Sequence, residues 1–167
     1  RIRVNVRCSR STAASRLIGR DRALTVWGVG RHPGCPSARQ SDGVWPDVGF
    51  GKGSLLFTAQ EYGLTPFGLD LRADNVAKLA RFGIAGECRD LTAFEEQGRF
   101  AVISMADVLE HMPFPVEGLR AAHRLIEPGG ALFLSMPNAE SMVWRALDAR
   151  KQNPYWGEVE HYHNFGR

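Results

Sequence analysis

The feature that most constrains the fold of this chain is a regular alternation of short apolar runs with helical patterns from residue 44 onward. The apolar runs predict strands, and apolar residues spaced three or four apart predict the helices between them. We expect strands at Val44–Val48, Thr65–Asp70, Ile84–Cys88, Phe100–Met105 and Ala131–Met136. Helices are expected over residues 54–62, 74–82, 116–126 and 141–149. Because strands that alternate with helices form parallel sheets covered on both faces, the expected fold is a three-layer α/β sandwich with a mostly parallel, Rossmann-like sheet.

Residues 1–44 differ from the rest of the chain in charge and pattern. They hold nine arginines, no lysine and only Asp21 and Asp42, a local charge of +7. The whole chain has a net charge of +3, so residues 45–167 carry 3 − 7 = −4. The positive total is therefore no evidence of nucleic-acid binding. Since residues 1–44 show no strand or helix period, we expect an irregular or disordered segment there, followed by one domain over residues 45–167.

Cysteine use and hydropathy limit where the protein works. Cys8, Cys35 and Cys88 are too scattered for a disulfide framework or a zinc site, which favours a reducing, cytoplasmic compartment. No apolar run approaches the roughly 20 residues that a membrane-spanning helix needs. Residues 45–167 contain no basic stripe interleaved with aromatic residues, so we expect no nucleic-acid partner. The oligomeric state leaves no signature in the sequence.

The loop after the first expected strand is almost bare of side chains. Gly49, Gly51 and Gly53 alternate there, shortly after Asp47. An NTPase phosphate loop would end in Gly-Lys-Ser/Thr, and a dinucleotide-binding loop has the spacing G-x-G-x-x-G, whereas this loop reads G-x-G-x-G. A carboxylate at the end of the strand suits a cationic amino-acid group better than a pyrophosphate. Because ligands of open α/β sheets bind where the strands end, we expect this loop to line a binding site.

Two further acids follow the next two strands. Asp70 ends the second expected strand, where a carboxylate in this fold accepts hydrogen bonds from both ribose hydroxyls. Asp90 lies just past the third strand and can meet an adenine amino group. A nucleoside joined to an ammonium and a sulfonium group describes S-adenosylmethionine (SAM). A nicotinamide-dependent oxidoreductase is the alternative, disfavoured by the glycine spacing and by Asp47.

At these residues the chain resembles the class I SAM-dependent methyltransferases. The resemblance lies in DVGFGKGS, GLD, ECRDL, VISMADVLEHM, HRLIEPGGALFLSMPN and PYWGEVEHYHNF. It implies transfer of the SAM methyl group, by in-line displacement, to a small-molecule acceptor, with O-methylation favoured. It also implies a set of cofactor-binding residues: Asp47 near the amino group, Gly49, Gly51 and Gly53 under the methionyl part, Asp70 on the ribose, Asp90 with Leu91 near adenine, and in addition Leu71 and Met105.

The stretch DVLEHM carries the side chains that can act on an acceptor. Asp107, Glu110 and His111 would point the same way if the segment formed one helical turn, and could then hold a divalent cation, as some family members do. We favour the alternative without a metal, in which these residues line the acceptor pocket. His111 is then the expected general base, because an imidazole can accept the proton of an acceptor hydroxyl near neutral pH. A structural role for His111 stays open.

The tail PYWGEVEHYHNF concentrates aromatic residues and histidines after the fifth expected strand. Loops at that end of such a fold shape the acceptor site, so these residues are expected to pack a substrate ring or to close over it. Covering the edge of the sheet is the alternative.

Two departures from the family pattern leave room for other interpretations. Phe50 stands where the family has a small residue, and Pro46 lies in a strand that the family places in the middle of the sheet, where proline removes a ladder donor. We therefore hypothesise that family sequence begins at Asp47, that residues 1–46 are foreign to it, and that the chain is truncated at both ends. A non-catalytic remnant of the fold is the corresponding alternative function.

Overall fold

The computed structural model describes residues 23–28 and 43–166. Its centre is a sheet with the strand order β1-β6-β5-β2-β3-β4, in which β1 pairs antiparallel with β6 and the other pairs are parallel. The strands are β1 (Ala23–Gly28), β2 (Val44–Val48), β3 (Thr65–Asp70), β4 (Ala85–Cys88), β5 (Phe100–Ala106) and β6 (Ile126–Met136). The helices are α1 (Ser54–Glu61), α2 (Ala73–Leu79), α3 (Pro115–Leu125) and α4 (Met142–Ala149). The expected parallel sheet and its helices are confirmed, although β6 already begins at Ile126.

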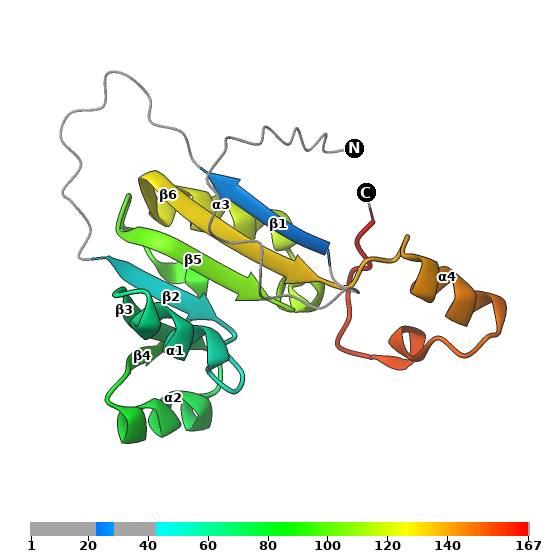
Figure 1. Ribbon diagram of the computed structural model, residues 1–167, viewed down its shortest axis with the longest axis horizontal. Coiled ribbons are helices and arrows are strands. Elements are labelled where there is room, and N and C mark those ends of the chain that lie inside the picture. The colour runs from blue at the N-terminus through cyan, green and yellow to red at the C-terminus, as the bar shows by residue number, and fades with distance from the viewer. Residues whose placement is uncertain (1–22, 29–42, 167) are drawn as a thin grey trace.

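The helices cover both faces of the sheet. In Figure 1, α1 and α2 lie on one side of β2, β3 and β4, α3 lies behind β5 and β6, and α4 lies beyond the carboxyl end of β6. The main core joins the sheet to α3 through buried residues such as Leu69, Ile103 and Leu125. A smaller apolar cluster, which includes Phe50 and Leu79, lies under α1 and α2. These layers confirm the three-layer sandwich.

The position of β2 explains where a ligand can enter. From β2 the chain continues outward on one side through β3 and β4, and it then returns to form β5 and β6 on the other side of β2. The loops after β2 and β5 therefore lead in opposite directions from the carboxyl edge of the sheet, and we expect the ligand-binding crevice of open α/β sheets at this edge.

One expectation about the start of the chain is corrected. Residues 23–28, which we expected to be irregular, form the edge strand β1. Residues 1–22 and 29–42 lie outside the described part of the chain, so the remainder of that expectation stays a prediction. Within residues 43–166, none of the helices is both long enough and apolar enough to cross a bilayer.

Pro46 also departs from expectation, because it lies fully buried in the middle of a central strand. Backbone groups of successive residues in a strand face opposite neighbours. The Gly49 N–H donates to the Leu69 carbonyl of β3, so the donor that Pro46 lacks would face β5. Pairing with β5 involves only Asp47 and Val48. Since that ladder begins after Pro46, the strand accommodates the proline, and our expectation of a conflict is wrong.

Candidate functional site

The glycine loop after β2 has a backbone that only glycine adopts readily. Gly49, Gly51 and Gly53 have φ angles of 61°, 54° and 78°, in the left-handed region. A methyl group on Gly49 would lie 2.9 Å from Cγ2 of Val108, whereas one on Gly51 would meet no atom closer than 3.9 Å. The loop thus packs tightly against the β5 side at Gly49, whereas Gly51 has room for a methyl group at van der Waals distance.

Asp47 lies buried at the carboxyl end of β2, held by the neighbouring strand. Its Oδ1 accepts a hydrogen bond of 2.6 Å from the Ser104 hydroxyl, which in turn accepts one of 2.9 Å from the Trp45 indole. Burial raises the pKa of Asp47 to about 7, although the Ser104 hydrogen bond opposes the shift. Sequence reasoning missed Ser104. A serine within the apolar run FAVISM, in direct register with Asp47, is the signal that could have found it.

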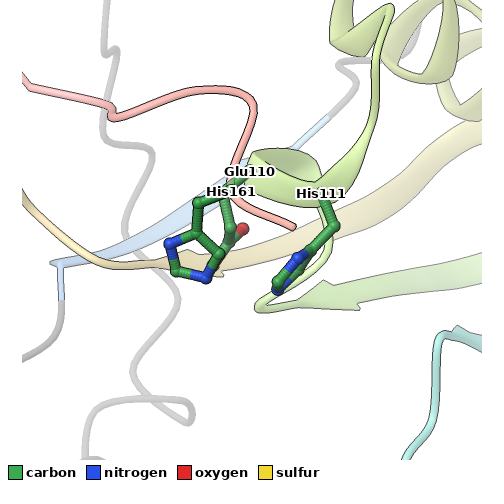
Figure 2. A group of neighbouring side chains, drawn as sticks. All are labelled: Glu110, His111 and His161. Carbon is green, nitrogen blue, oxygen red and sulfur yellow. The ribbon is translucent and has the colours of Figure 1, made fainter. Parts of the chain in front are cut away.

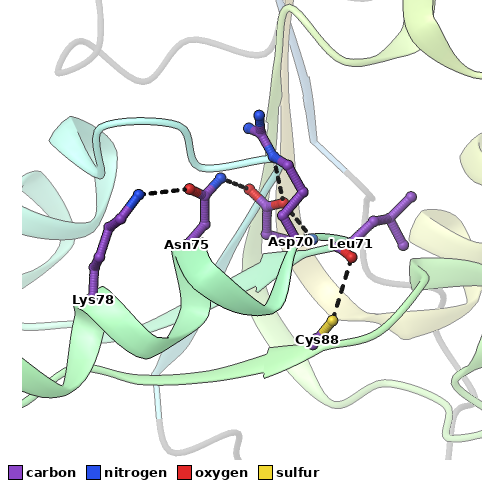
Figure 3. Close-up of polar contacts among 6 residues, drawn as sticks. Asp70, Leu71, Asn75, Lys78 and Cys88 are labelled. Carbon is purple, nitrogen blue, oxygen red and sulfur yellow. Dashed lines mark hydrogen bonds and ion pairs between the residues drawn. The ribbon is translucent and has the colours of Figure 1, made fainter.

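Asp70 lies at the end of β3 and is held in place by residues that follow it closely in the chain (Figure 3). Its carboxylate accepts hydrogen bonds of 2.9 Å from the Arg72 backbone N–H and 2.9 Å from the Asn75 amide. The Arg72 guanidinium lies 3.4 Å away. The next residue, Leu71, is 70% exposed, and its carbonyl accepts a hydrogen bond from the Cys88 thiol. Asn75 was not foreseen as a partner of Asp70.

Asp90, Leu91 and Met105 contribute to the site unequally. Oδ1 of Asp90 accepts hydrogen bonds of 2.7 Å and 2.6 Å from the backbone and hydroxyl of Thr92, and so caps the 3-10 turn η2 (Leu91–Ala93). The side chains of Leu91 and Met105 are buried in the main core, so only their backbone atoms can reach a ligand. The structure therefore brings Asp47, the glycine loop, Asp70, Leu71 and Asp90 to the ends of three adjacent strands.

A second group lies on the other side of the crevice, at the 3-10 turn η3 (Leu109–His111) after β5. Figure 2 shows Glu110 and His111 on this turn beside His161, which comes from the segment after the 3-10 turn η4 (Pro154–Gly157). Glu110 is 1% exposed, and neither of its carboxylate oxygens has a hydrogen-bond partner within residues 23–28 and 43–166. Burial raises the pKa of Glu110 and the nearby Asp107 raises it further, whereas the backbone N–H of Glu110 and the two imidazoles oppose the shift.

The structure corrects the metal-ligand set that we considered. Among the described residues, the side-chain ligand atoms of Glu110, His111 and His161 lie within 4.8 Å of one another, and Asp107 is not in this group. Asp107 precedes the turn with a φ of 54°, so it does not share one helical face with Glu110 and His111. A carboxylate and two imidazoles are of the types that bind divalent cations, but three ligands without a fourth leave a metal unspecified.

The orientation of His111 follows from a contact with the C-terminal segment. Its Nδ1 lies 3.0 Å from the carbonyl oxygen of Glu160. Because a carbonyl can only accept a hydrogen bond, Nδ1 carries the proton and the neutral ring keeps its lone pair on Nε2. His161 and Glu160 lie about fifty positions from the turn, and no spacing in the sequence indicated that they meet it.

A model of the family described as "Methyltransferase domain" matches residues 33–167. The match begins before Asp47, so our expectation that family sequence starts at Asp47 is corrected for residues 33–46. The ubiquinone biosynthesis O-methyltransferase of Pseudomonas paraeruginosa is 38% identical over 100 residues, which are 55% of this chain and 43% of that protein. The protein of the same name from Sodalis glossinidius is 33% identical over 108 residues, 59% of this chain and 43% of its own length. The chain thus spans less than half the length of these curated relatives.

Solved structures share the fold at low sequence identity. A SAM-dependent methyltransferase from Archaeoglobus fulgidus superposes with a TM-score of 0.60 at 16% identity, over 74% of this chain and 54% of that one. A putative methyltransferase from Bacillus halodurans gives a TM-score of 0.60 at 18% identity, over 77% and 58% of the two chains. At these identities the likeness concerns the fold.

Proposed function

Because the chain belongs to the methyltransferase domain family of class I SAM-dependent methyltransferases, we propose that it transfers the methyl group of SAM to a hydroxyl of a small-molecule acceptor. One observation carries the proposal. Asp47, a glycine loop with open space at Gly51, and Asp70 lie together at the switch point of the sheet. This arrangement offers one carboxylate to an ammonium group, bare backbone to a sulfonium and a second carboxylate to a ribose.

The residues on the cofactor side bind and orient. SAM supplies a methyl group activated by its positively charged sulfur. Asp47 faces the amino group and becomes fully ionised against it, while Ser104 keeps the carboxylate fixed. Asp70 accepts hydrogen bonds from the ribose hydroxyls in a position that Arg72 and Asn75 already hold. Alignment of the methyl group with the acceptor is then the main contribution of the protein to the rate.

His111 is proposed as the general base on the acceptor side. As the hydroxyl oxygen bonds to the methyl carbon and the carbon–sulfur bond breaks, the hydroxyl proton passes to Nε2 of His111. The contact of Nδ1 with the Glu160 carbonyl supports this role, because it leaves Nε2 unprotonated. The name of the curated relatives, ubiquinone biosynthesis O-methyltransferase, favours a phenolic hydroxyl as the acceptor.

A reducing, cytoplasmic compartment is part of the proposal. Cys88, the only cysteine among the described residues, is a free and exposed thiol, which is typical of proteins kept under reducing conditions.

Calorimetric titration with S-adenosylhomocysteine (SAH) and with NADH tests the proposal. We expect saturable SAH binding and no NADH binding, followed by methyl transfer from SAM to a catechol. Binding of NADH alone would indicate a nicotinamide-dependent oxidoreductase. Binding of neither ligand would indicate a remnant of the fold without catalytic function.

A further inference from the structure

The C-terminal segment, residues 158–166, is tied to the turn that carries His111. The Glu110 carbonyl accepts hydrogen bonds of 2.8 Å and 3.3 Å from the backbone N–H groups of Tyr162 and His163. Nε2 of His163 lies 3.3 Å from the Pro113 carbonyl. Further on, the Phe165 carbonyl accepts a hydrogen bond of 2.8 Å from the N–H of Ala139, just after β6. The segment is thus anchored both at η3 and at the end of β6, and it places the Glu160 carbonyl against His111.

The Glu110 side chain is a buried ionisable group at this contact. A carboxyl group that is 1% exposed is costly to bury when, as here, no other residue in the described part of the chain donates a hydrogen bond to replace its water. The titratable groups that act on it are Asp107 and His111 from its own loop and His161 from the C-terminal segment. Asp107 only adds negative charge, and His111 has its Nδ1 proton directed at Glu160. His161 is therefore the donor left for Glu110.

His161 has the complementary requirement. Its Nδ1 is buried and has no hydrogen-bond partner among the residues that the structure describes, and a ligand atom of its ring lies within 4.8 Å of one from Glu110. The ring is fixed from two sides, since its centroid lies 4.5 Å from that of His111 and 5.8 Å from that of Tyr155. An Nδ1–H of His161 directed at the Glu110 carboxylate would satisfy both buried groups.

We propose that Glu110 and His161 form a buried carboxylate–imidazole hydrogen bond that locks the C-terminal segment onto the turn and thereby holds His111 in the tautomer that leaves Nε2 free. Both are positioning residues, because they act through the Glu160 carbonyl on His111. The inference rests on the proposed function in one respect, the use of Nε2 as a base. The structural part, one tautomer of His111 fixed by this pair, stands without it.

The test uses two substitutions that differ in one donor. His161→Leu removes the donor and keeps an apolar side chain, whereas the amide of His161→Asn places an N–H near the former Nδ1. Tyr162→Phe is the control, because Tyr162 belongs to the same segment and is 62% exposed. Two-bond ¹H–¹⁵N spectra of the ¹⁵N-labelled chain give the tautomer of His111. For each variant we also measure turnover with SAM and a catechol, and SAH affinity by calorimetry.

In the parent chain and in His161→Asn, we expect a single Nδ1–H tautomer of His111. In His161→Leu, we expect a mixture of tautomers and a loss of kcat of about tenfold or more, since misplacement of a catalytic group by 1 Å can cost about a hundredfold. SAH affinity should stay within about twofold in all three variants. Equal behaviour of the Leu and Asn variants would overturn the inference. So would loss of parent activity in EDTA with recovery on Zn²⁺ or Mg²⁺, because the cluster would then be a metal site. If no acceptor is methylated but the tautomers change as expected, the proposed function fails and the positioning pair stands.

Discussion

The cofactor side and the acceptor side of the site differ in how their polar side chains are held in place. On the cofactor side, near neighbours in the chain hold Asp70 and Asp90, through Arg72, Asn75 and Thr92, and only Asp47 depends on a distant residue, Ser104. On the acceptor side, Glu110 and His111 meet His161 across about fifty residues, and no described residue donates a hydrogen bond to the Glu110 carboxylate. The carboxylates of the first side all accept hydrogen bonds before a ligand arrives, whereas the second side has an unpaired carboxylate and depends on the C-terminal segment. Substitutions should therefore separate cofactor binding from turnover.

The largest effect on the cofactor side is expected from Asp70→Ala. Loss of two hydrogen bonds to a charged acceptor costs about 3 kcal/mol, so SAH affinity should fall about a hundredfold in calorimetric titration. Asp74→Ala is the matched control, because this aspartate lies exposed in the first turn of α2. If His161→Leu weakened SAH binding as strongly as Asp70→Ala, the two sides of the crevice would not be separable.

The same contrast explains how much the sequence alone could predict. Apolar periodicity located the five parallel strands, and the spacing of Asp47, the glycines and Asp70 led us to propose the cofactor side, because these features are local. Ser104 and Asn75 were missed because their roles depend on strand register and on the start of α2. The strand β1 escaped because its pairing partner, β6, follows about a hundred residues later. The tail that holds His161 was expected near the acceptor, but its contact with Glu110 could not be foreseen, since only the folded chain brings the two residues together.

Two glycines of one loop should respond differently to the same change. Both have a positive φ, which costs an alanine about 1 kcal/mol. Gly49→Ala adds a contact of 2.9 Å with Val108, on the loop that leads to the acceptor side, so we expect a total loss of stability of about 2 kcal/mol. Gly51→Ala has open space and should lose only about 1 kcal/mol. Urea unfolding measures both values. Equal losses would mean that the loop does not pack on Val108.

The raised pKa of Asp47 predicts a pH dependence that the acceptor side should not share. Below pH 7 the free protein holds Asp47 protonated, and the ligand ammonium favours the ionised form, so binding releases a proton. SAH affinity should rise with pH, by at most about tenfold per unit, between pH 5 and 7, and fall again above about pH 8 as the ligand amine loses its charge.

Asp47→Asn should flatten the rise of SAH affinity with pH below pH 7.

The free energy of unfolding of the unliganded protein should fall, rather than rise, as the pH increases. The pKa of Asp47 is about 7 in the folded state and 3.8 for an unperturbed aspartate, so the folded state binds more protons between these values. The contribution of Asp47 to stability is therefore full below pH 4 and is lost as the pH rises toward 7. Thermal unfolding as a function of pH, in the parent chain and in Asp47→Asn, measures this difference.

The smallest effect is expected at Asp90, where the local cap and the ligand contact can be told apart. Asp90→Ala removes the cap of η2 and should cost about 1 kcal/mol of stability. Asp90→Asn keeps an acceptor for Thr92 and should restore most of that stability. Because Oδ1 already accepts two hydrogen bonds from Thr92, the loss of SAH affinity in Asp90→Ala should stay below about tenfold. A loss of SAH affinity as large as that of Asp70→Ala would mean that the hydrogen bonds of the cofactor side are not complete until the ligand binds. The cofactor side and the acceptor side would then differ only in degree.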